Sequence, residues 1–218
     1  MGIRAPLVQF EQESLALCGL DYPGLRWCEL GNQRIDRKPA KGTYLAHGVD
    51  AHVAIDLNGK DGAMPLNLDD PVPFLFRDQF DVISNYGTSE HVNNQYRVFK
   101  NAHDMCKMNG LIINIVPREG HWPGHCRYFY TQEFAAALQD ACDYELVLGR
   151  ILDQDMYQAP KNLVAFTYRK RKEDFISPET FAKLGGLADT GDTSRTGDYN
   201  RKTLKHKLRA IWAVLTES

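Results

Sequence analysis

Residues 80–92 read FDVISNYGTSEHV, and this stretch decides the fold. Apolar residues gather over 80–84, a run of strand length. The Asn-Tyr-Gly triplet at 85–87 then breaks the run as a turn does, because glycine allows backbone conformations that other residues rarely adopt. Thr88 or Ser89 is placed to cap a helix that follows. Strand, turn and capped helix are the unit of an open parallel sheet, whose ligands bind at the carboxyl ends of the strands.

The composition is that of a globular protein of one domain, or of one domain with an appendage. Of the 218 residues, 43% are hydrophobic and 25% are charged, which is ordinary for a soluble chain. The net charge of −2 gives no overall attraction to nucleic acid, so we expect no nucleic-acid partner. Residues 1–10 lack the apolar run of a signal peptide, and no run approaches the length of a membrane span. We therefore expect a cytoplasmic protein with no membrane partner.

The cysteines favour the same compartment. There are five of them, an odd number, and no two form a C-x-x-C pair. Scattered cysteines of this kind indicate reduced thiols rather than a disulfide framework. They are Cys18, Cys28, Cys106, Cys126 and Cys142.

Strand and helix patterns alternate along the rest of the chain. Besides 80–84, apolar runs predict strands at 25–30, 52–57 and 111–117, a weaker one at 65–70, and two last ones at 144–148 and 162–168. Helices are predicted at 7–20, 41–47, 93–108 and 131–141, the last capped by Thr131. This order predicts an α/β fold: a doubly wound, mostly parallel sheet of seven strands with helices on both faces.

The end of the chain has a different character. The basic run at 169–172 is typical of a solvated strand end, and 185–199 is rich in Gly, Asp, Thr and Ser, as linkers are. One apolar helix face is then marked by Leu204, Leu208, Ile211 and Leu215. We expect an α/β domain over 1–172, and a linker with an amphipathic helical appendage over 173–218. The appendage would dock on the sheet domain or on a second copy of the chain, so a homodimer is an option; a membrane-surface helix is the less favoured alternative.

Four strings along the predicted sheet form a recognisable set. They are CELGN at 28–32, AIDLNG at 54–59, FDVISNYGTSEHV at 80–92 and GLIINIVP at 110–117. Together they resemble the class I S-adenosylmethionine-dependent methyltransferases, over about residues 25–172, and the Glu90-His91-Val92 string is the most specific part. The resemblance implies a Rossmann-like sheet, S-adenosyl-L-methionine as the cofactor, and a transferase that methylates a small-molecule acceptor.

The resemblance also implies which residues hold the cofactor. In that family the loop after the first strand cradles the methionine part, and the acid after the second strand binds the ribose. The acid after the third strand lies near the adenine amine, and the loop after the fourth lines the methyl-donor pocket. Carried over to this sequence, the resemblance implies that the methionine part is held by Glu29, Gly31, Asn32 and Gln33. It implies that the ribose and adenine are held by Asp56, Leu57 and Asp69, and that the methyl-donor pocket is lined by Asn85, Tyr86 and Gly87.

The first loop departs from the family pattern. That pattern reads glycine-x-glycine-x-glycine, whereas here only Gly31 is kept and Gln33 and Ile35 take the other two places. Gln33 could narrow the methionine pocket or hydrogen-bond the cofactor's carboxylate. Two functions therefore stay open: a methyltransferase, and a catalytically inactive relative that serves as a binding or scaffold protein. A nicotinamide-dependent oxidoreductase would need a GxGxxG loop, which residues 31–36 do not supply.

Catalytic residues are harder to assign, because methyl transfer needs a general base only when the acceptor is a hydroxyl that must lose its proton. His121 and His125, in the loop after the fifth strand, are the candidates, and His91 is the weaker one. His121, His125 and Cys126 could also suggest a metal site, but a Pro-Gly pair separates the two histidines, so no helix face fixes their geometry and we expect no metal. The aromatic residues of this loop could line an acceptor site or pack in the core; they are Trp122, Tyr128, Phe129 and Tyr130.

Overall fold

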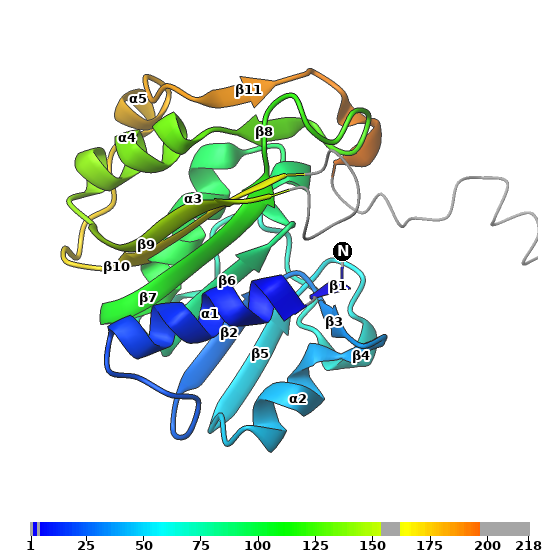
Figure 1. Ribbon diagram of the computed structural model, residues 1–218. Coiled ribbons are helices and arrows are strands. Elements are labelled where there is room, and N and C mark those ends of the chain that lie inside the picture. The colour runs from blue at the N-terminus through cyan, green and yellow to red at the C-terminus, as the bar shows by residue number, and fades with distance from the viewer. Residues whose placement is uncertain (1, 4, 154–161, 197–218) are drawn as a thin grey trace, which may run out of the picture.

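The computed structural model describes residues 2–3, 5–153 and 162–196 (Figure 1). Its centre is a six-stranded sheet in the order β5-β2-β6-β7-β10-β9. In chain order these strands are β2 (Arg26–Leu30), β5 (Ala51–Ile55), β6 (Phe80–Tyr86), β7 (Cys106–Pro117), β9 (Glu145–Leu152) and β10 (Leu163–Arg169). β2, β5, β6 and β7 pair in parallel, whereas β10 runs antiparallel to both of its neighbours. The predicted mostly parallel sheet is confirmed.

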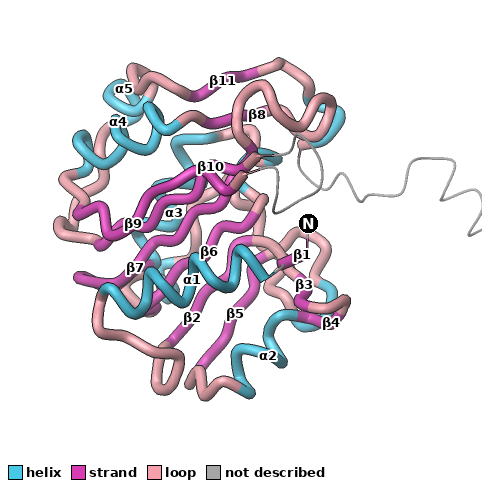
Figure 2. The backbone as a smooth tube through the Cα atoms, in the orientation of Figure 1, coloured by secondary structure: helices cyan, strands magenta, loops and turns pink. Residues whose placement is uncertain are grey.

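Helices cover both faces of the sheet, as predicted (Figures 1 and 2). α1 (Ala5–Leu17) and α2 (Ala40–Ala46) contribute to one apolar cluster, and α3 (Gln95–Met105) and α4 (Gln132–Cys142) contribute to the other. Successive strand side chains point to opposite faces. In β6, accordingly, Val82 packs in the α1 cluster and Ile83 packs in the α3 cluster.

Smaller elements lie around the sheet. β1 (Gly2–Ile3), β3 (Arg34–Ile35) and β4 (Lys38–Pro39) form a three-stranded sheet in the order β1-β3-β4. β8 (Tyr128–Tyr130) pairs with β11 (Leu187–Asp189). The short helical turns are η1 (Lys60–Gly62), η2 (Phe74–Phe76), η3 (Ser89–His91), α5 (Pro178–Phe181) and η5 (Thr193–Arg195). In the described ranges, no helix is both long and apolar enough to cross a membrane.

The strand predicted at 65–70 is wrong, which leaves six strands in the described part of the sheet instead of seven. Met64, the residue before this segment, forms an isolated parallel bridge with Ile55 of β5. The side chain of Asn67 then accepts the N–H of Asp69 at 3.1 Å, and its carbonyl accepts the N–H of Asp70 at 3.1 Å. These local bonds make a turn, and nearby prolines lack the N–H groups that a strand ladder uses.

The start of the helix after β6 was also predicted wrongly. Ser89 belongs to the separate turn η3, and α3 begins later, capped by Asn94, whose side chain accepts the N–H of Arg97 at 3.0 Å. The Thr88 hydroxyl is used elsewhere, because it donates to the carbonyl of Leu30 at 2.7 Å. α3 ends at Met105 rather than at 108, since β7 already begins at Cys106.

The basic run at 169–172 is only partly a solvated strand end. Lys170 is 2% exposed, and its ammonium group donates to Asp78 and to the carbonyls of His103 and Cys106. Arg171 is exposed and pairs with Glu145. One lysine of the run therefore ties the end of β10 to the α3–β7 junction.

Residues 173–196, expected to be linker, form α5 and β11. Phe181 is buried in the α3 cluster, and β11 continues the edge of β8. Arg127 donates to both carboxylate oxygens of Asp189, at 2.8 and 2.7 Å, which adds a charged contact to this pairing. The amphipathic helix predicted from Leu204 to Leu215 lies outside the described residues.

Candidate functional site

The carboxyl ends of the parallel strands β2, β5, β6 and β7 meet at one edge of the sheet, where most of the predicted site residues lie (Figure 1). Gly31 opens the loop after β2 with a φ of 85°, in the left-handed region that favours glycine. A Cβ at this position would lie 2.3 Å from the Thr88 hydroxyl oxygen. The loop after β2 and the loop after β6 are therefore in close contact.

Gln33 fills the gap between these two loops. Its side chain, in a residue only 5% exposed, donates to the carbonyl oxygen of Tyr86 at 2.8 Å and to the Thr88 hydroxyl at 3.3 Å. A glycine, which the methyltransferase pattern has at this place, would leave that space open. The side chain thus narrows the part of the edge that was predicted to hold the methionine end of the cofactor.

Glu29 lies beneath the first loop. It is 1% exposed, and one carboxylate oxygen accepts the N–H of Gln33 at 2.6 Å. The other oxygen lies 3.6 Å from Nε2 of the buried His52. Glu29 therefore fixes the loop from below, and its carboxylate is enclosed by protein.

Asp56 and Leu57 follow β5 and lie at the edge of the sheet. The Asp56 carboxylate accepts the N–H of Asn32 at 3.0 Å on one oxygen and the N–H of Asn58 at 2.9 Å on the other. The residue is half-buried, and the next side chain, Leu57, is 37% exposed. The Asn32 side chain points elsewhere, since it donates to the carbonyl of Lys60 at 2.9 Å.

Asp69 lies in the turn at 67–70 and contacts Asn94, the residue that caps α3. One of its carboxylate oxygens accepts the N–H of Asn94 at 2.7 Å, and the residue is half-buried. The turn at 67–70 and the α3 cap are thereby joined. This contact places Asp69 beside the segment that follows β6.

Asn85 and Gly87 shape the loop after β6. The Asn85 amide donates to Ser89 Oγ at 2.9 Å and to Asn114 Oδ1 at 3.0 Å, and its oxygen accepts the N–H of Ser89 at 3.1 Å. Gly87 has a φ of 73°, and its N–H donates to the carbonyl of Ile115 at 3.0 Å. Asn85 is 2% exposed, so its side chain fixes the turn η3 from inside the protein.

The side chain of Tyr86 points away from the edge, into a buried cluster that the sequence did not reveal. Glu11 of α1 accepts the hydroxyls of Tyr22 at 2.6 Å, Tyr44 at 2.7 Å and Tyr86 at 2.5 Å. Burial raises the pKa of Glu11 against the lowering effect of these donors. The available signal was its spacing, four residues after Leu7 on the apolar face of the helix.

A second buried carboxylate follows the loop after β6. Glu90 is fully buried, and its Oε1 lies 4.0 Å from His91 Nε2 and 3.9 Å from His125 Nε2. The two imidazole rings meet edge to face at 5.2 Å. Burial raises the pKa of Glu90 to about 8 and lowers the pKa of His91 to about 4. The ligand atoms of the three residues all lie within 4.8 Å of one another.

The sequence had grouped His125 with His121 and Cys126 instead. The Cys126 thiol donates to the carbonyl of Tyr128 at 3.1 Å, and burial raises its pKa. Nδ1 of His121 is buried with no hydrogen-bond partner among the described residues. All four aromatic residues of this loop are buried: Trp122, Tyr128, Phe129 and Tyr130. They pack in the core, one of the two roles left open for them.

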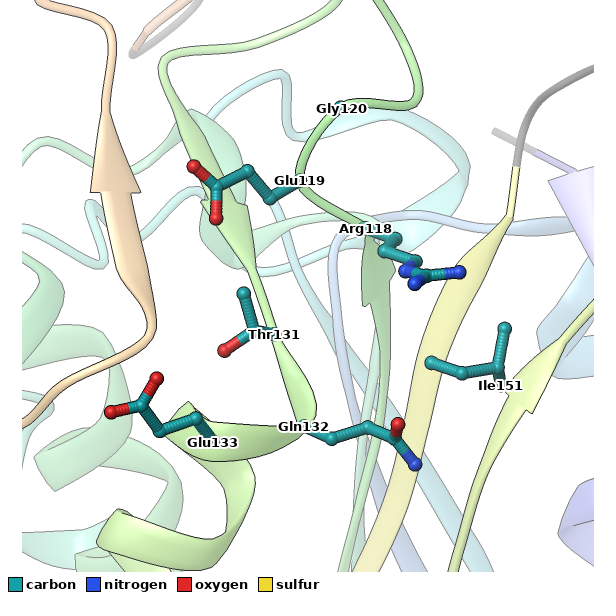
Figure 3. Close-up of a pocket in the computed structure, with 7 residues that line it drawn as sticks. All are labelled: Arg118, Glu119, Gly120, Thr131, Gln132, Glu133 and Ile151. Carbon is teal, nitrogen blue, oxygen red and sulfur yellow. The ribbon is translucent and has the colours of Figure 1, made fainter.

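An open cleft of about 460 Å³ lies beyond the end of β7 (Figure 3). Arg118 and Glu119 follow β7 directly, and Figure 3 shows their side chains pointing to different sides. Five of its seven lining residues have polar or charged side chains; the lining residues are Arg118, Glu119, Gly120, Thr131, Gln132, Glu133 and Ile151. The cleft is large enough for a small ligand.

Solved structures share this arrangement of strands and helices. A 1,6-didemethyltoxoflavin-N1-methyltransferase from Burkholderia thailandensis, bound to 1,6-didemethyltoxoflavin and S-adenosylhomocysteine, superposes with a TM-score of 0.56 at 15% identity, over 75% of this chain and 78% of that one. The N-methyltransferase NodS from Bradyrhizobium japonicum, in complex with S-adenosylhomocysteine, gives a TM-score of 0.52 at 11% identity, over 76% of this chain and 85% of that one.

The chain has the class I methyltransferase fold. The fold implied by the four sequence strings is thereby confirmed. No protein-family model matches the chain, and no curated protein matches its sequence. The [4+2]-cyclase SpnF shares the fold with a TM-score of 0.55 at 12% identity, over 78% of this chain and 83% of that one. Because a cyclase and methyltransferases share this methyltransferase fold, the reaction must be argued from the site itself.

Proposed function

We propose that the chain is an S-adenosylmethionine-dependent methyltransferase that acts on a small molecule. The observation that carries the proposal is the half-buried Asp56 at the end of β5, beside the exposed side chain of Leu57. Each carboxylate oxygen accepts one backbone N–H and keeps a lone pair for a ribose hydroxyl. Leu57 offers an apolar surface to the adenine. Neighbours with this fold were solved with S-adenosylhomocysteine, which supports the cofactor.

Asp56 and Leu57 supply the contacts proposed for the adenosine half of the cofactor. The methionine half meets the Gln33 side chain, which bonds to the carbonyl of Tyr86. Rotation of this side chain out of the gap would open the space and free that carbonyl to accept an ammonium N–H. Cofactor binding as proposed therefore requires this side chain to move, in a loop whose backbone Glu29 holds in place.

When bound, the cofactor supplies a methyl group already activated on a sulfonium. The protein must then orient an acceptor and exclude water. The polar cleft beyond β7 offers room for the acceptor at the same edge of the sheet, with Arg118 and Glu119 as charged contacts (Figure 3). If the acceptor is a hydroxyl, His121 is the better-placed base of the two candidates, because the other one, His125, lies against Glu90.

A second function is favoured by one observation. The Gln33 amide occupies the methionine part of the site, so the same fold could bind a nucleoside without transferring a methyl group. In that case adenosine would bind and the addition of the amino-acid end would weaken binding. A titration that compares the two ligands separates the functions.

Asp56→Ala tests the assignment of the ribose contact. Removal of a charged acceptor of two hydroxyl hydrogen bonds costs roughly 1.5–3 kcal/mol, so we expect the Kd for S-adenosylhomocysteine to rise about 10- to 100-fold in calorimetric titration. Asp50→Ala, at the opposite end of β5, is the matched control and should bind as the wild type does. An unchanged Kd in Asp56→Ala would refute the assignment.

A further inference from the structure

The carboxyl group of Glu90 is buried without a hydrogen-bond partner among the described residues. The residue is 0% exposed, and within the described part of the chain neither of its oxygens accepts a hydrogen bond. An isolated carboxylate is costly to bury, and such groups are normally paired or bound to a metal. The groups that approach it are two imidazole nitrogens, at 4.0 and 3.9 Å.

The two histidines present ligand atoms to this carboxylate. Nδ1 of His91 lies 2.8 Å from the backbone carbonyl of Arg195, which selects the tautomer with the proton on Nδ1 and leaves a lone pair on Nε2. Nε2 is the atom that faces Glu90. A hydrogen bond from the remote nitrogen to a carbonyl is the usual way in which proteins orient a metal-binding histidine.

The elements that carry the three residues are well fixed. Glu90 and His91 belong to the turn η3, which is held by the bond from Ser89 N–H to Asn85 and by the Tyr130 hydroxyl donating to Ser89 Oγ at 2.9 Å. His125 comes from the loop between β7 and β8, and its ring lies 5.1 Å from that of Trp122. Two segments distant in sequence thus converge on one point.

We propose that Glu90, His91 and His125 bind a divalent transition-metal ion. Two imidazoles with one carboxylate suit Zn²⁺, Mn²⁺, Fe²⁺ or Co²⁺. Ligand atoms about 2.1 Å from a shared tetrahedral ion lie about 3.4 Å apart. The two separations from Glu90, 4.0 and 3.9 Å, are close to that value, and all three ligand atoms lie within 4.8 Å of one another. A bound ion would balance the negative charge of the Glu90 carboxylate, so that the buried group could be ionised there.

Three protein ligands leave at least one coordination position open. Glu90 follows Gly87 by three residues, so the open coordination position of the ion would lie near the loop predicted to line the methyl-donor pocket. An oxygen of the acceptor could bind there. This role for the ion rests on the proposed methyltransferase function, whereas the metal site itself does not.

Titration of the full-length, chelator-treated protein with Zn²⁺ or Co²⁺ alone tests the site. We expect one ion per chain by calorimetry, and Co²⁺ should give visible absorption bands of a site that contains protein ligands. Glu90→Gln and His125→Ala should each weaken binding at least 100-fold. His121→Ala, in the same loop but outside the cluster, should bind as the wild type does.

Each outcome decides the proposal. Absence of binding by the wild type at about 100 µM metal overturns it, and so does unchanged affinity in both cluster variants. His125 has a side chain 29% exposed, so His125→Ala carries the test if Glu90→Gln does not fold, as judged by circular dichroism. Metal binding without any binding of S-adenosylhomocysteine would support the site and remove only its role in methyl transfer.

Discussion

At the scale of single residues, Gln33 is the clearest departure from a methyltransferase site. Its side-chain amide donates a hydrogen bond to the carbonyl oxygen of Tyr86 at 2.8 Å. Gln33→Ala removes this contact, which contributes roughly 0.5–1.5 kcal/mol, so S-adenosylmethionine should bind about 2- to 10-fold more tightly. Calorimetric titration measures the change. Adenosine, which lacks the amino-acid end, is the control ligand, and its affinity should stay the same; equal gains for both ligands would contradict a role at the methionine end.

The Glu11 cluster makes a prediction about stability. Tyr86→Phe removes one of three hydroxyls that donate to this buried carboxylate. A hydrogen bond to a charged group contributes about 2 kcal/mol, so urea unfolding should show a loss of that order. Tyr96→Phe removes the hydroxyl of a half-buried tyrosine outside the cluster and should change the unfolding free energy by less. Equal losses in the two variants would argue against a special role for the cluster.

The sequence located site positions better than it described their roles. Asp56 could be predicted because an acid at the end of a strand lies at the edge of a parallel sheet. Glu29, Asn85 and Tyr86 were assigned from the family resemblance, and in the structure their side chains bond to other parts of the protein. Their partners are Gln33, Ser89 and Glu11, and such contacts between loops and helices leave no periodic pattern in the sequence.

At the scale of elements, His103 links α3 to two other segments. Its Nδ1 contacts the Tyr144 hydroxyl and its Nε2 contacts the carbonyl of Glu173, both at 2.8 Å. Burial lowers the pKa of His103 to about 4. In the unfolded chain the pKa is about 6.5, so protons bind the unfolded state more readily and stability is lost as the pH falls from about 6.5 toward 4.

The size of this loss is measurable. Between pH 7 and pH 5 the contribution of His103 to the unfolding free energy should fall by about 2 kcal/mol. His103→Gln cannot titrate, so the difference between wild type and variant should shrink by that amount over the same range in urea unfolding. A difference that is constant with pH would show that the histidine is not held neutral.

The elements themselves were predicted where pattern and capping agreed. α4 begins after Thr131, whose hydroxyl accepts the N–H of Phe134 at 3.3 Å, as its position in the sequence indicated. The failures have specific causes. At 65–70 the side chain of Asn67 forms a local turn instead of a strand. The Thr88 hydroxyl, expected to cap a helix, instead donates to the carbonyl of Leu30, which is distant in sequence.

At the scale of the whole molecule, the order of the strands follows from simple rules. Buried apolar runs separated by helices predict a parallel sheet with covered faces, and both clusters of the core conform to this. The site depends on something else, the meeting of four strand ends at one edge. The sequence marked those ends with acids and glycines, but the pairing of His125 with Glu90 required the folded chain.

The measurement that tests the central claim most directly is calorimetric titration of the wild-type protein with S-adenosylmethionine, S-adenosylhomocysteine and NAD. The proposed function predicts that the first two bind at one site per chain, in competition with each other, and that NAD does not bind. If neither sulfur-containing ligand binds, or if NAD binds in their place, the proposed function is contradicted.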